Sequence, residues 1–246
     1  MDDFVKALVK SHQLGNPYPS FTSLDSGATL EKAYNIQCQF VEGINEAIVG
    51  YKAALTAEPA QKAMNIDQAI TGVLFRDGDY SSRAQIESSR SLLIETELGF
   101  RTNQEIRNQI SVESVYSFIA TVHPMIELAS PNLNKPPNGI DLVATNSASF
   151  GYMEGAGFEC SATEPDSIEV TLSHNGKNLH TGSCASVMSG QKQALVWLVN
   201  QIISQRGHLE SNSLLMSGAV GQPHPAKQGK YKADFGAMGL MEFSIA

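Results

Sequence analysis

The chain lacks the residue patterns on which disulfide frameworks and histidine metal sites are built. Its 246 residues include three cysteines, Cys38, Cys160 and Cys184, which are widely spaced and form no CxxC pair. An odd number of scattered cysteines indicates neither a disulfide framework nor a thiolate zinc site. The histidines show no HxH or HxxxH spacing, so the pattern of a histidine metal site is absent as well.

Positive charge and long apolar runs are also scarce. The 25 acidic and 17 basic residues give a formal net charge of -8, and no Lys/Arg cluster is dense enough to follow a phosphate backbone. No apolar run reaches the roughly 18 residues of a membrane span. The first residues, MDDFVKALVK, lack the basic start and long apolar core of a signal peptide. We expect no nucleic-acid or membrane partner and a cytoplasmic location.

The first third of the sequence has the periodicity of helices. Apolar residues of DDFVKALVKSHQLG share one helical face up to Gly15, and Thr29 can cap a second helix with apolar residues at helical spacing. Pro59 can open a brief helix that runs through Met64. A helical N-terminal part is therefore predicted for residues 1–68.

From about residue 70 the sequence changes to short strands separated by turns. The candidate strands are TGVLF, LLIETELGF, HPMIELA, DLVATNSASFGY, SIEVTLSHNGK, SLLMSGAV and GLMEFSIA, preceded by IVGYKAALT. Asn175-Gly176 predicts a hairpin turn. Helices are expected near residues 111–120 and from Ser189, as N-cap, to Gly207. We predict an α+β fold in which residues 69–246 form a β-rich mixed sandwich or roll.

The strand candidate LLIETELGF carries two carboxylates, Glu95 and Glu97, two residues apart. Because side chains alternate along a strand, both project from one face, about 7 Å apart. Two like charges so close are unfavourable unless a cation lies between them, and hard cations such as Mg²⁺ prefer oxygen ligands. An edge strand whose polar face meets water explains the same spacing, so both interpretations stay open.

A third acid and a lysine lie in similarly apolar surroundings. Glu127 sits within HPMIELAS, and Lys52 within GYKAALT. Three carboxylates with water suit an octahedral Mg²⁺ or Mn²⁺ site that leaves positions for a substrate. A buried salt bridge between Lys52 and Glu127 is the alternative, and a desolvated lysine can also acquire a lowered pKa that is useful in catalysis.

The segments GYKAALT, IETE, HPMIE, DLVATNSASFG, ALVWLVNQI and LLMSGAVG, in this order, resemble the fumarylacetoacetate hydrolase-like superfamily. Within it, the chain is most similar to the branch of 2-keto-4-pentenoate hydratases and 4-oxalocrotonate decarboxylases. The resemblance implies a homo-oligomer with Mg²⁺ or Mn²⁺ held by Glu95, Glu97 and Glu127, and with Lys52 as a catalytic residue. It places the substrate-binding positions at Leu55, Ile70, Asn146, Ser147, Ser217 and Gly218.

The resemblance also implies a lyase of aromatic-compound catabolism that acts on a small 2-oxo acid or its dienol form. Water addition, as in the hydratases, is the leading reaction, and decarboxylation is the alternative. Ile70 occupies a position where hydratases carry an aspartate, and Asp67 could compensate only if the backbone brings it round. The chain departs from the family also at Thr145, at Ser189–Gln191 and at Asn212-Ser213, so a changed or lost activity is a third reading.

Other classes of function fit less well. Ser189 and Lys192 have the S-x-x-K spacing of serine acyl-enzymes, but the accompanying motifs are absent. Cys184 and His180 could be drawn as a thiol and its base, yet no third residue is identifiable to orient them. His123 either lines the site or packs in the core. A non-enzymatic scaffold that keeps the fold without the reaction is the remaining alternative.

Overall fold

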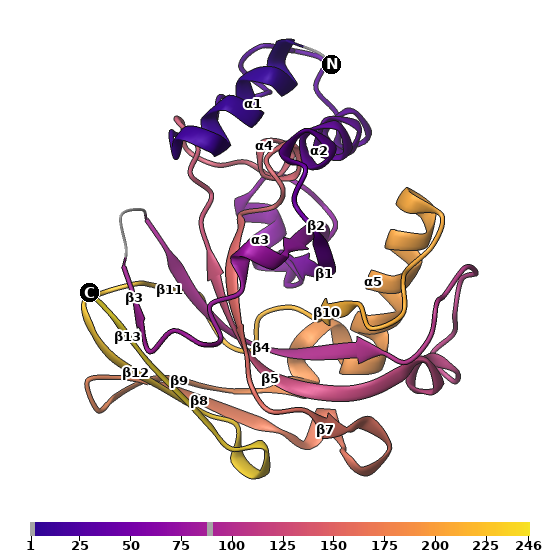
Figure 1. The fold of residues 1–246 in the computed structure, drawn as a ribbon, viewed down its shortest axis with the longest axis vertical. Helices are drawn as coiled ribbons and strands as arrows, with labels where there is room; N and C mark the ends of the chain where they lie inside the picture. Colours follow the sequence, from indigo (N-terminus) through magenta and orange to yellow (C-terminus); the bar gives the residue numbers. More distant parts are fainter. Residues whose placement is uncertain (1–2, 88–90) are drawn as a thin grey trace.

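The computed structural model describes residues 3–87 and 91–246 (Figure 1). The α-helices in these ranges are α1 (Asp3–Leu14), α2 (Leu30–Ile44), α3 (Glu58–Ala63), α4 (Gly139–Ala144) and α5 (Gln191–Arg206). The strands are β1 (Ile48–Ala54), β2 (Ile70–Phe75), β3 (Gln85–Ile86), β4 (Leu93–Thr102), β5 (Ile119–Ala129), β6 (Ser149–Glu154), β7 (Phe158–Glu159), β8 (Glu169–His174), β9 (Lys177–Ser183), β10 (Leu214–Met216), β11 (His224–Pro225), β12 (Gly229–Asp234) and β13 (Leu240–Ile245). In the described ranges, no helix combines the length and apolar character that a bilayer span needs.

The larger of two sheets has eight strands, in the order β2-β1-β10-β4-β5-β6, with β11 paired to β4 and β7 paired to β5. β1 and β10 are parallel, and the other pairs are antiparallel. β4 and β5 are the longest strands and lie at its centre. On one face of β4, Ile94, Leu98 and Phe100 have no exposed surface and belong to the main apolar core. The opposite face of β4 carries Glu95 and Glu97.

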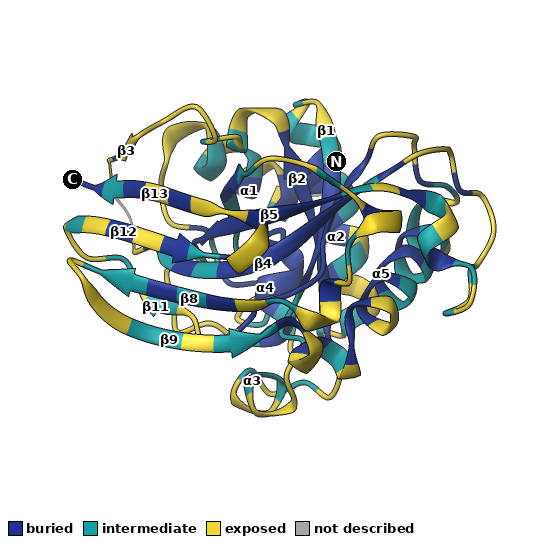
Figure 2. Cartoon of the chain, turned by 90° about the horizontal axis from the view of Figure 1, so that it is seen from below, coloured by how far each residue is buried: buried dark blue, intermediate teal, exposed yellow. Residues whose placement is uncertain are grey.

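The smaller sheet, β3-β13-β12-β8-β9, lies beside β4 and β5 (Figure 1). Its strand β12 alternates between buried Tyr231 and Ala233 and exposed Lys230 and Lys232, and Figure 2 shows buried and exposed positions along this strand. The buried residues join the apolar face of β4 in one core. The two sheets thus enclose the main core between them, as in a sandwich.

The N-terminal helices pack with α4 at one end of the larger sheet (Figure 1). Their apolar faces form a second core cluster that includes Val5, Leu8 and Phe40. Asp141 of α4 ties this cluster together, because its buried carboxylate accepts hydrogen bonds from the Thr22 amide (2.8 Å) and from the hydroxyls of Ser20 (2.8 Å) and Thr22 (2.9 Å).

The α+β class and most elements are as predicted. Thr29 caps α2 by accepting a hydrogen bond from the Lys32 amide, and α5 ends at Gly207 in a left-handed conformation. The predicted turn at Asn175-Gly176 joins β8 to β9, and both residues have positive φ, as a type I′ turn requires. The division at residue 68 stays a prediction. β1, which precedes it, is part of the larger sheet.

The helix expected near residues 111–120 is wrong. The chain forms a short 3-10 turn, Val115–Phe118, and β5 then begins at Ile119. The serine hydroxyls of this segment compete with helical backbone bonds, because Ser114 Oγ donates to the Ser111 carbonyl and Ser117 Oγ donates to the Ser114 carbonyl.

The strand expected over DLVATNSASFGY is wrong in its first half. Asn138 caps α4 by accepting a hydrogen bond from the Asp141 amide, and β6 begins only at Ser149. The residues Leu142, Val143 and Ala144 are all buried. Their sequence therefore has no hydrophobic periodicity that would distinguish a buried helix from a strand. β12 was missed, because its short alternation of lysines with Tyr231 and Ala233 resembles a loop.

A second correction concerns the start of α5. The N-cap residue is Gly190 rather than Ser189, and the first amide of the helix, that of Gln191, donates instead to Asp166 Oδ1 at 2.7 Å. A cap supplied by a residue about 25 positions away cannot be read from local sequence.

We predict that Asp141→Leu destabilises the protein by about 3 kcal/mol, because it removes the acceptor of several buried and partly buried donors. Chemical denaturation measures this change. Asp3→Ala is the matched control, since Asp3 forms an ion pair with Lys6 at the surface, and such surface pairs contribute less than about 1 kcal/mol. Equal effects of the two substitutions would contradict the role given to Asp141.

Candidate metal centre

The structure brings the three predicted glutamates together. Glu95 of β4 lies directly opposite Glu127 of β5 in the antiparallel register, and Glu97 follows on the same face of β4. The three residues can each place a carboxylate oxygen within 4.8 Å of the others. Glu97 and Glu127 are buried, and Glu95 is partly exposed. That these residues bind a metal stays a prediction.

Lys52 of β1 completes the cluster. Its buried ammonium forms an ion pair with Glu127 Oε1. Gly72 of β2 lies opposite Lys52 in the sheet, and a Cβ at Gly72 would lie only 3.2 Å from Lys52 Cε. The absent side chain at residue 72 thus makes room for the lysine. The salt bridge considered from sequence is present, and within residues 3–87 and 91–246 neither Glu95 nor Glu97 forms an ion pair of its own.

The environment disfavours charge on these two carboxylates. Burial, followed by the nearby Glu127 carboxylate, raises the pKa of Glu95 to about 7, although Lys52 opposes the shift. Burial also raises the pKa of Glu97 well above its ordinary value, and the carboxylates of Glu127 and Glu95 add to the shift. Lys52 and the Gly218 amide act in the opposite direction. Each carboxyl must therefore hold a proton or meet a cation.

Glu97 provides the test of whether the site fits a metal ion. Its Oε2 accepts a hydrogen bond from the Gly218 amide at 3.0 Å, whereas its Oε1 is buried and has no hydrogen-bond partner among the described residues. A buried carboxylate oxygen without a donor is costly. The three side chains offer only oxygen donors, and Glu97 Oε1 is available to bind an ion. Both features fit Mg²⁺ or Mn²⁺.

Two of the predicted substrate-binding residues lie beside Lys52. Asn146 O and Ser147 Cβ approach the same point over Gly72 as Lys52 Cε, to 3.1 and 3.2 Å from a Cβ built there. The backbone at Asn146, Ser147 and Ala148 is left-handed, with φ of 65, 52 and 59°, which is unfavourable for non-glycine residues. Asn146 holds this turn by bonding both the amide and the carbonyl of Val73, at 2.7 and 3.0 Å.

The other predicted substrate-binding residues have different surroundings. Ser217 Oγ donates to the Leu98 carbonyl, and Gly218 is bonded to Glu97 as described. Leu55 directly follows β1 and has a φ of 52°. Ile70 is buried in the apolar cluster of the N-terminal helices. Their contacts with a substrate stay predictions.

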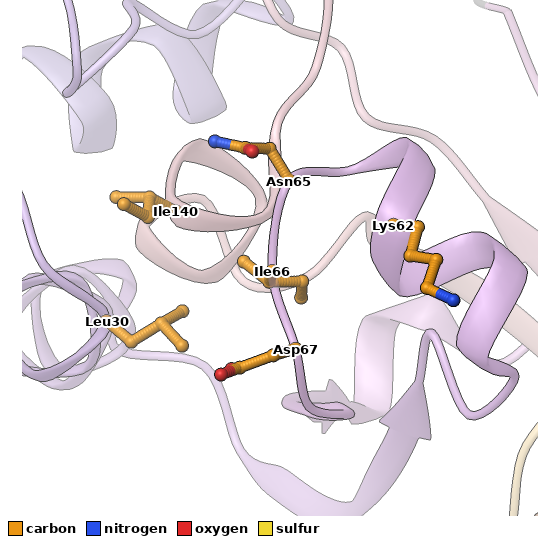
Figure 3. Close-up of a pocket in the computed structure, with 6 residues that line it drawn as sticks. All are labelled: Leu30, Lys62, Asn65, Ile66, Asp67 and Ile140. Carbon is orange, nitrogen blue, oxygen red and sulfur yellow. The ribbon is translucent and has the colours of Figure 1, made fainter.

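Asp67, the possible substitute for an acid at position 70, is exposed and absent from the glutamate cluster. It lines a separate pocket of about 500 Å³ (Figure 3). The residues that line this pocket come from α2, α3, α4 and the segment after α3: Leu30, Lys62, Asn65, Ile66, Asp67 and Ile140.

The remaining candidates from the sequence lie in structural contacts. Thr145 follows α4 and donates to the Asp141 carbonyl. His123 bonds Thr121 and the Gly155 carbonyl. The Lys192 ammonium lies over the Tyr116 ring, 5.0 Å from its centre.

Sequence reasoning missed the parts of the site that act through backbone atoms or distant neighbours. Gly72 and the amide of Gly218 carry no side-chain signal. His180 is bonded to Thr96 and His224, and these three residues are far apart in the sequence. A second group of possible ligands, Glu105, His208 and Glu210, was also missed. It lies at the surface, and its members already form ion pairs there.

The chain is similar in sequence to known hydratases. No family model matches the chain. The 2-oxo-hept-4-ene-1,7-dioate hydratase of Escherichia coli is 25% identical over 230 residues, which cover 86% of this chain and 85% of the relative. The 2-keto-4-pentenoate hydratase of Paraburkholderia xenovorans is 23% identical over 240 residues, which cover 93% of this chain and 88% of the relative.

Solved structures with the same fold include the 4-oxalocrotonate decarboxylase of Pseudomonas putida G7 complexed with magnesium and adipate. Its TM-score is 0.92 at 19% identity, over 99% of this chain and 96% of that one. The fumarylpyruvate hydrolase of Pseudomonas aeruginosa, complexed with Mn²⁺ and pyruvate, has a TM-score of 0.61 at 11% identity, over 80% and 88%. Together with the sequence relatives, these likenesses support the resemblance of the chain to the fumarylacetoacetate hydrolase-like superfamily and, within it, to the branch of the 2-keto-4-pentenoate hydratases and 4-oxalocrotonate decarboxylases.

Proposed function

We propose that the protein is a divalent-metal-dependent lyase that adds water to a 2-hydroxydienoate, the dienol form of a 2-oxo acid. The observation that carries this proposal is the cluster of partly exposed Glu95 with buried Glu97 and Glu127, in which Glu97 Oε1 has no hydrogen-bond partner in the described part of the chain. The names of the hydratase relatives support the reaction type. The cytoplasmic location and the homo-oligomeric state stay predictions.

Glu95, Glu97 and Glu127 would hold the ion, Mg²⁺ or Mn²⁺. When bound, the ion polarises the 2-oxygen of a 2-oxo acid and so acidifies the neighbouring C–H. Metal complexes of neighbours in the fold support this chemistry, since one holds magnesium with adipate and another Mn²⁺ with pyruvate. The three carboxylates, which lie on one face of β4 and β5, would balance the charge of the ion.

Lys52 supplies the proton chemistry in this proposal. Its ammonium forms an ion pair with Glu127, so a metal ion at the site would compete for the same carboxylate. Lys52 would then be available to bind a substrate oxygen or to move a proton. Asn146 and Ser147 lie beside its side chain. Lys52, Glu97, Glu127, Asn146 and Ser147 are all buried, so a substrate here is shielded from bulk water.

Decarboxylation is the second candidate, because of Ile70. An apolar side chain at the start of β2, buried beside Phe40 and Leu142, offers no acid to activate water. The decarboxylase from Pseudomonas putida G7 is also a neighbour with a TM-score of 0.92. A site without a water-activating acid is compatible with release of carbon dioxide from a diacid.

Product analysis separates the two reactions. We expect the purified protein with Mg²⁺ to convert a 2-hydroxydienoate to the 4-hydroxy-2-oxo acid. Loss of the dienoate absorbance measures the rate, and NMR identifies the product. A 2-oxo-3-enedioate is the matched second substrate. Carbon dioxide release from it, with no hydration of the first, would establish the alternative. No reaction with either substrate at saturating Mg²⁺ would contradict the proposed function.

Glu97→Gln tests the metal site with a neutral side chain of the same shape. We expect this variant to lose stabilisation by Mg²⁺ and to lose at least about 100-fold in kcat/KM, because a ligand is removed. Without metal, it should melt higher than the parent, since a buried like charge is gone. Glu159→Gln, at an exposed position of β7, is the control. A variant that keeps its response to Mg²⁺ would exclude Glu97 as a ligand.

The pH dependence of stability follows from the shifted carboxyls. The pKa of Glu95 rises from 4.5 to about 7 on folding. Without metal, the contribution of this group to the free energy of unfolding is therefore full below pH 4.5 and is lost as pH rises through about 7. Metal binding needs the deprotonated form. We expect Mg²⁺ at about 100 times its Kd to raise the Tm by about 5–10 °C near pH 8.

Near pH 5.5 we expect little of this increase in Tm. Thermal melts with Mg²⁺ and with a chelator, at equal ionic strength, measure the difference. An effect of Mg²⁺ that is independent of pH over this range would argue against carboxylates as the ligands.

A further inference from the structure

Residues 217–221, which we call loop 217–221, connect β10 toward β11 and lie along β4. The Ser217 amide donates to the Leu98 carbonyl at 3.1 Å, and the Val220 amide donates to the Thr96 carbonyl at 2.7 Å. Between these two anchors, the Gly218 amide reaches Glu97 Oε2 at 3.0 Å. The loop therefore sets the orientation of one carboxylate of the candidate metal centre, through a single backbone hydrogen bond.

The same loop is also bonded to the opposite face of β4. Thr96 lies between Glu95 and Glu97 but points away from them, and its hydroxyl donates to the Val220 carbonyl at 2.8 Å. That hydroxyl has one hydrogen, so its contact of 3.1 Å with His180 Nε2 requires the imidazole to donate. His180 is therefore the tautomer with hydrogen on Nε2.

The second nitrogen of His180 fixes the next residue. With Nε2 protonated, the neutral ring must accept at Nδ1, and His224 Nε2 lies 2.8 Å away as the donor. The two rings stack, with centroids 5.0 Å apart and planes within 9°. Burial lowers the pKa of both histidines, which agrees with two neutral rings. A directed chain of hydrogen bonds thus runs from His224 through His180 and Thr96 to Val220.

His180 also supports the loop by direct contact. A Cβ at Gly221, whose φ is +88°, would lie 2.4 Å from His180 Cδ2, so the bare backbone rests on the ring. A Cβ at Gly182 of β9 would lie 2.9 Å from the Gly221 amide nitrogen. These two glycines let the edge strand of the smaller sheet approach the loop, and His180 is the residue of that strand that reaches Thr96.

We propose that His180 is a positioning residue: together with Thr96 and His224 it fixes loop 217–221, so that the Gly218 amide holds Glu97 in the orientation that binds the metal. The role rests on the proposed function. It links the smaller sheet, which contributes none of the three glutamates, to the metal centre. Groups that orient metal ligands typically change metal affinity by about 10–100-fold when they are removed.

The test compares variants that break or keep the chain of hydrogen bonds. Thr96→Val removes the hydroxyl and keeps the branched shape, and His180→Leu removes the donor. Thr96→Ser and His180→Gln retain a hydrogen-bonding group. Thr171→Val is the matched control, since the Thr171 hydroxyl bonds only Thr181 on the smaller sheet, at 2.9 Å and exposed. Calorimetric titration with Mg²⁺ alone gives the affinity, and amide hydrogen exchange of residues 217–221 gives the order of the loop.

We expect Thr96→Val and His180→Leu to weaken Mg²⁺ binding about tenfold or more and to speed exchange at Gly218 and Val220. The two conservative variants and the control should stay within about twofold of the parent. Parent-like affinity and exchange in Thr96→Val, or an equal loss in Thr171→Val, would overturn the proposal. If the parent itself binds neither Mg²⁺ nor Mn²⁺, the proposed function fails, and the exchange rates alone then decide whether His180 holds the loop.

Discussion

The repulsion among three buried carboxylates is the constraint on which the rest of the structure depends. At the separation of 4.8 Å or less given by the geometry, each like-charge pair costs about 3 kcal/mol at an effective dielectric constant of about 20. Lys52 offsets one of the three charges. One like-charge pair, that of Glu95 and Glu97, then remains, and its cost of about 3 kcal/mol is a large fraction of the stability of a typical domain, about 5–15 kcal/mol. The cluster must therefore hold protons, as the raised pKa values of Glu95 and Glu97 indicate, or a cation.

The fold creates this cluster through the register of its central strands. Glu95 faces Glu127 because β4 and β5 pair without a shift along that stretch, and β1 brings Lys52 over Gly72. A register slip of one residue would move the acids to the apolar core side. Ile94, Leu98 and Phe100, which are fully buried against the smaller sheet, make such a slip unfavourable. Packing of the apolar face of β4 thus keeps Glu95 and Glu97 on the opposite face.

The sequence was sufficient for the features that depend on periodicity and residue type. Alternation along LLIETELGF predicted that Glu95 and Glu97 share a face, and the apolar surroundings of Lys52 indicated either an ion pair with an acid or a lowered pKa. The predictions that failed concern segments in which side-chain hydrogen bonds replace the expected local structure, and local sequence patterns do not encode this competition. Serine hydroxyls replaced the helix near residues 111–120, and a distant Asp166 took the place of a capping Ser189. Gly72, the Gly218 amide and the Thr96–His180–His224 chain act through tertiary proximity, which has no signature in a single sequence.

Whether the three glutamates share one ion is measured most directly by anomalous diffraction from crystals grown with Mn²⁺. The account predicts a single strong peak within coordination distance, about 2.2 Å, of oxygens from Glu95, Glu97 and Glu127, with Lys52 displaced from its position on Glu127. A map without a peak there, with the Lys52–Glu127 ion pair intact, or with manganese only at the surface group of Glu105, His208 and Glu210, would contradict it.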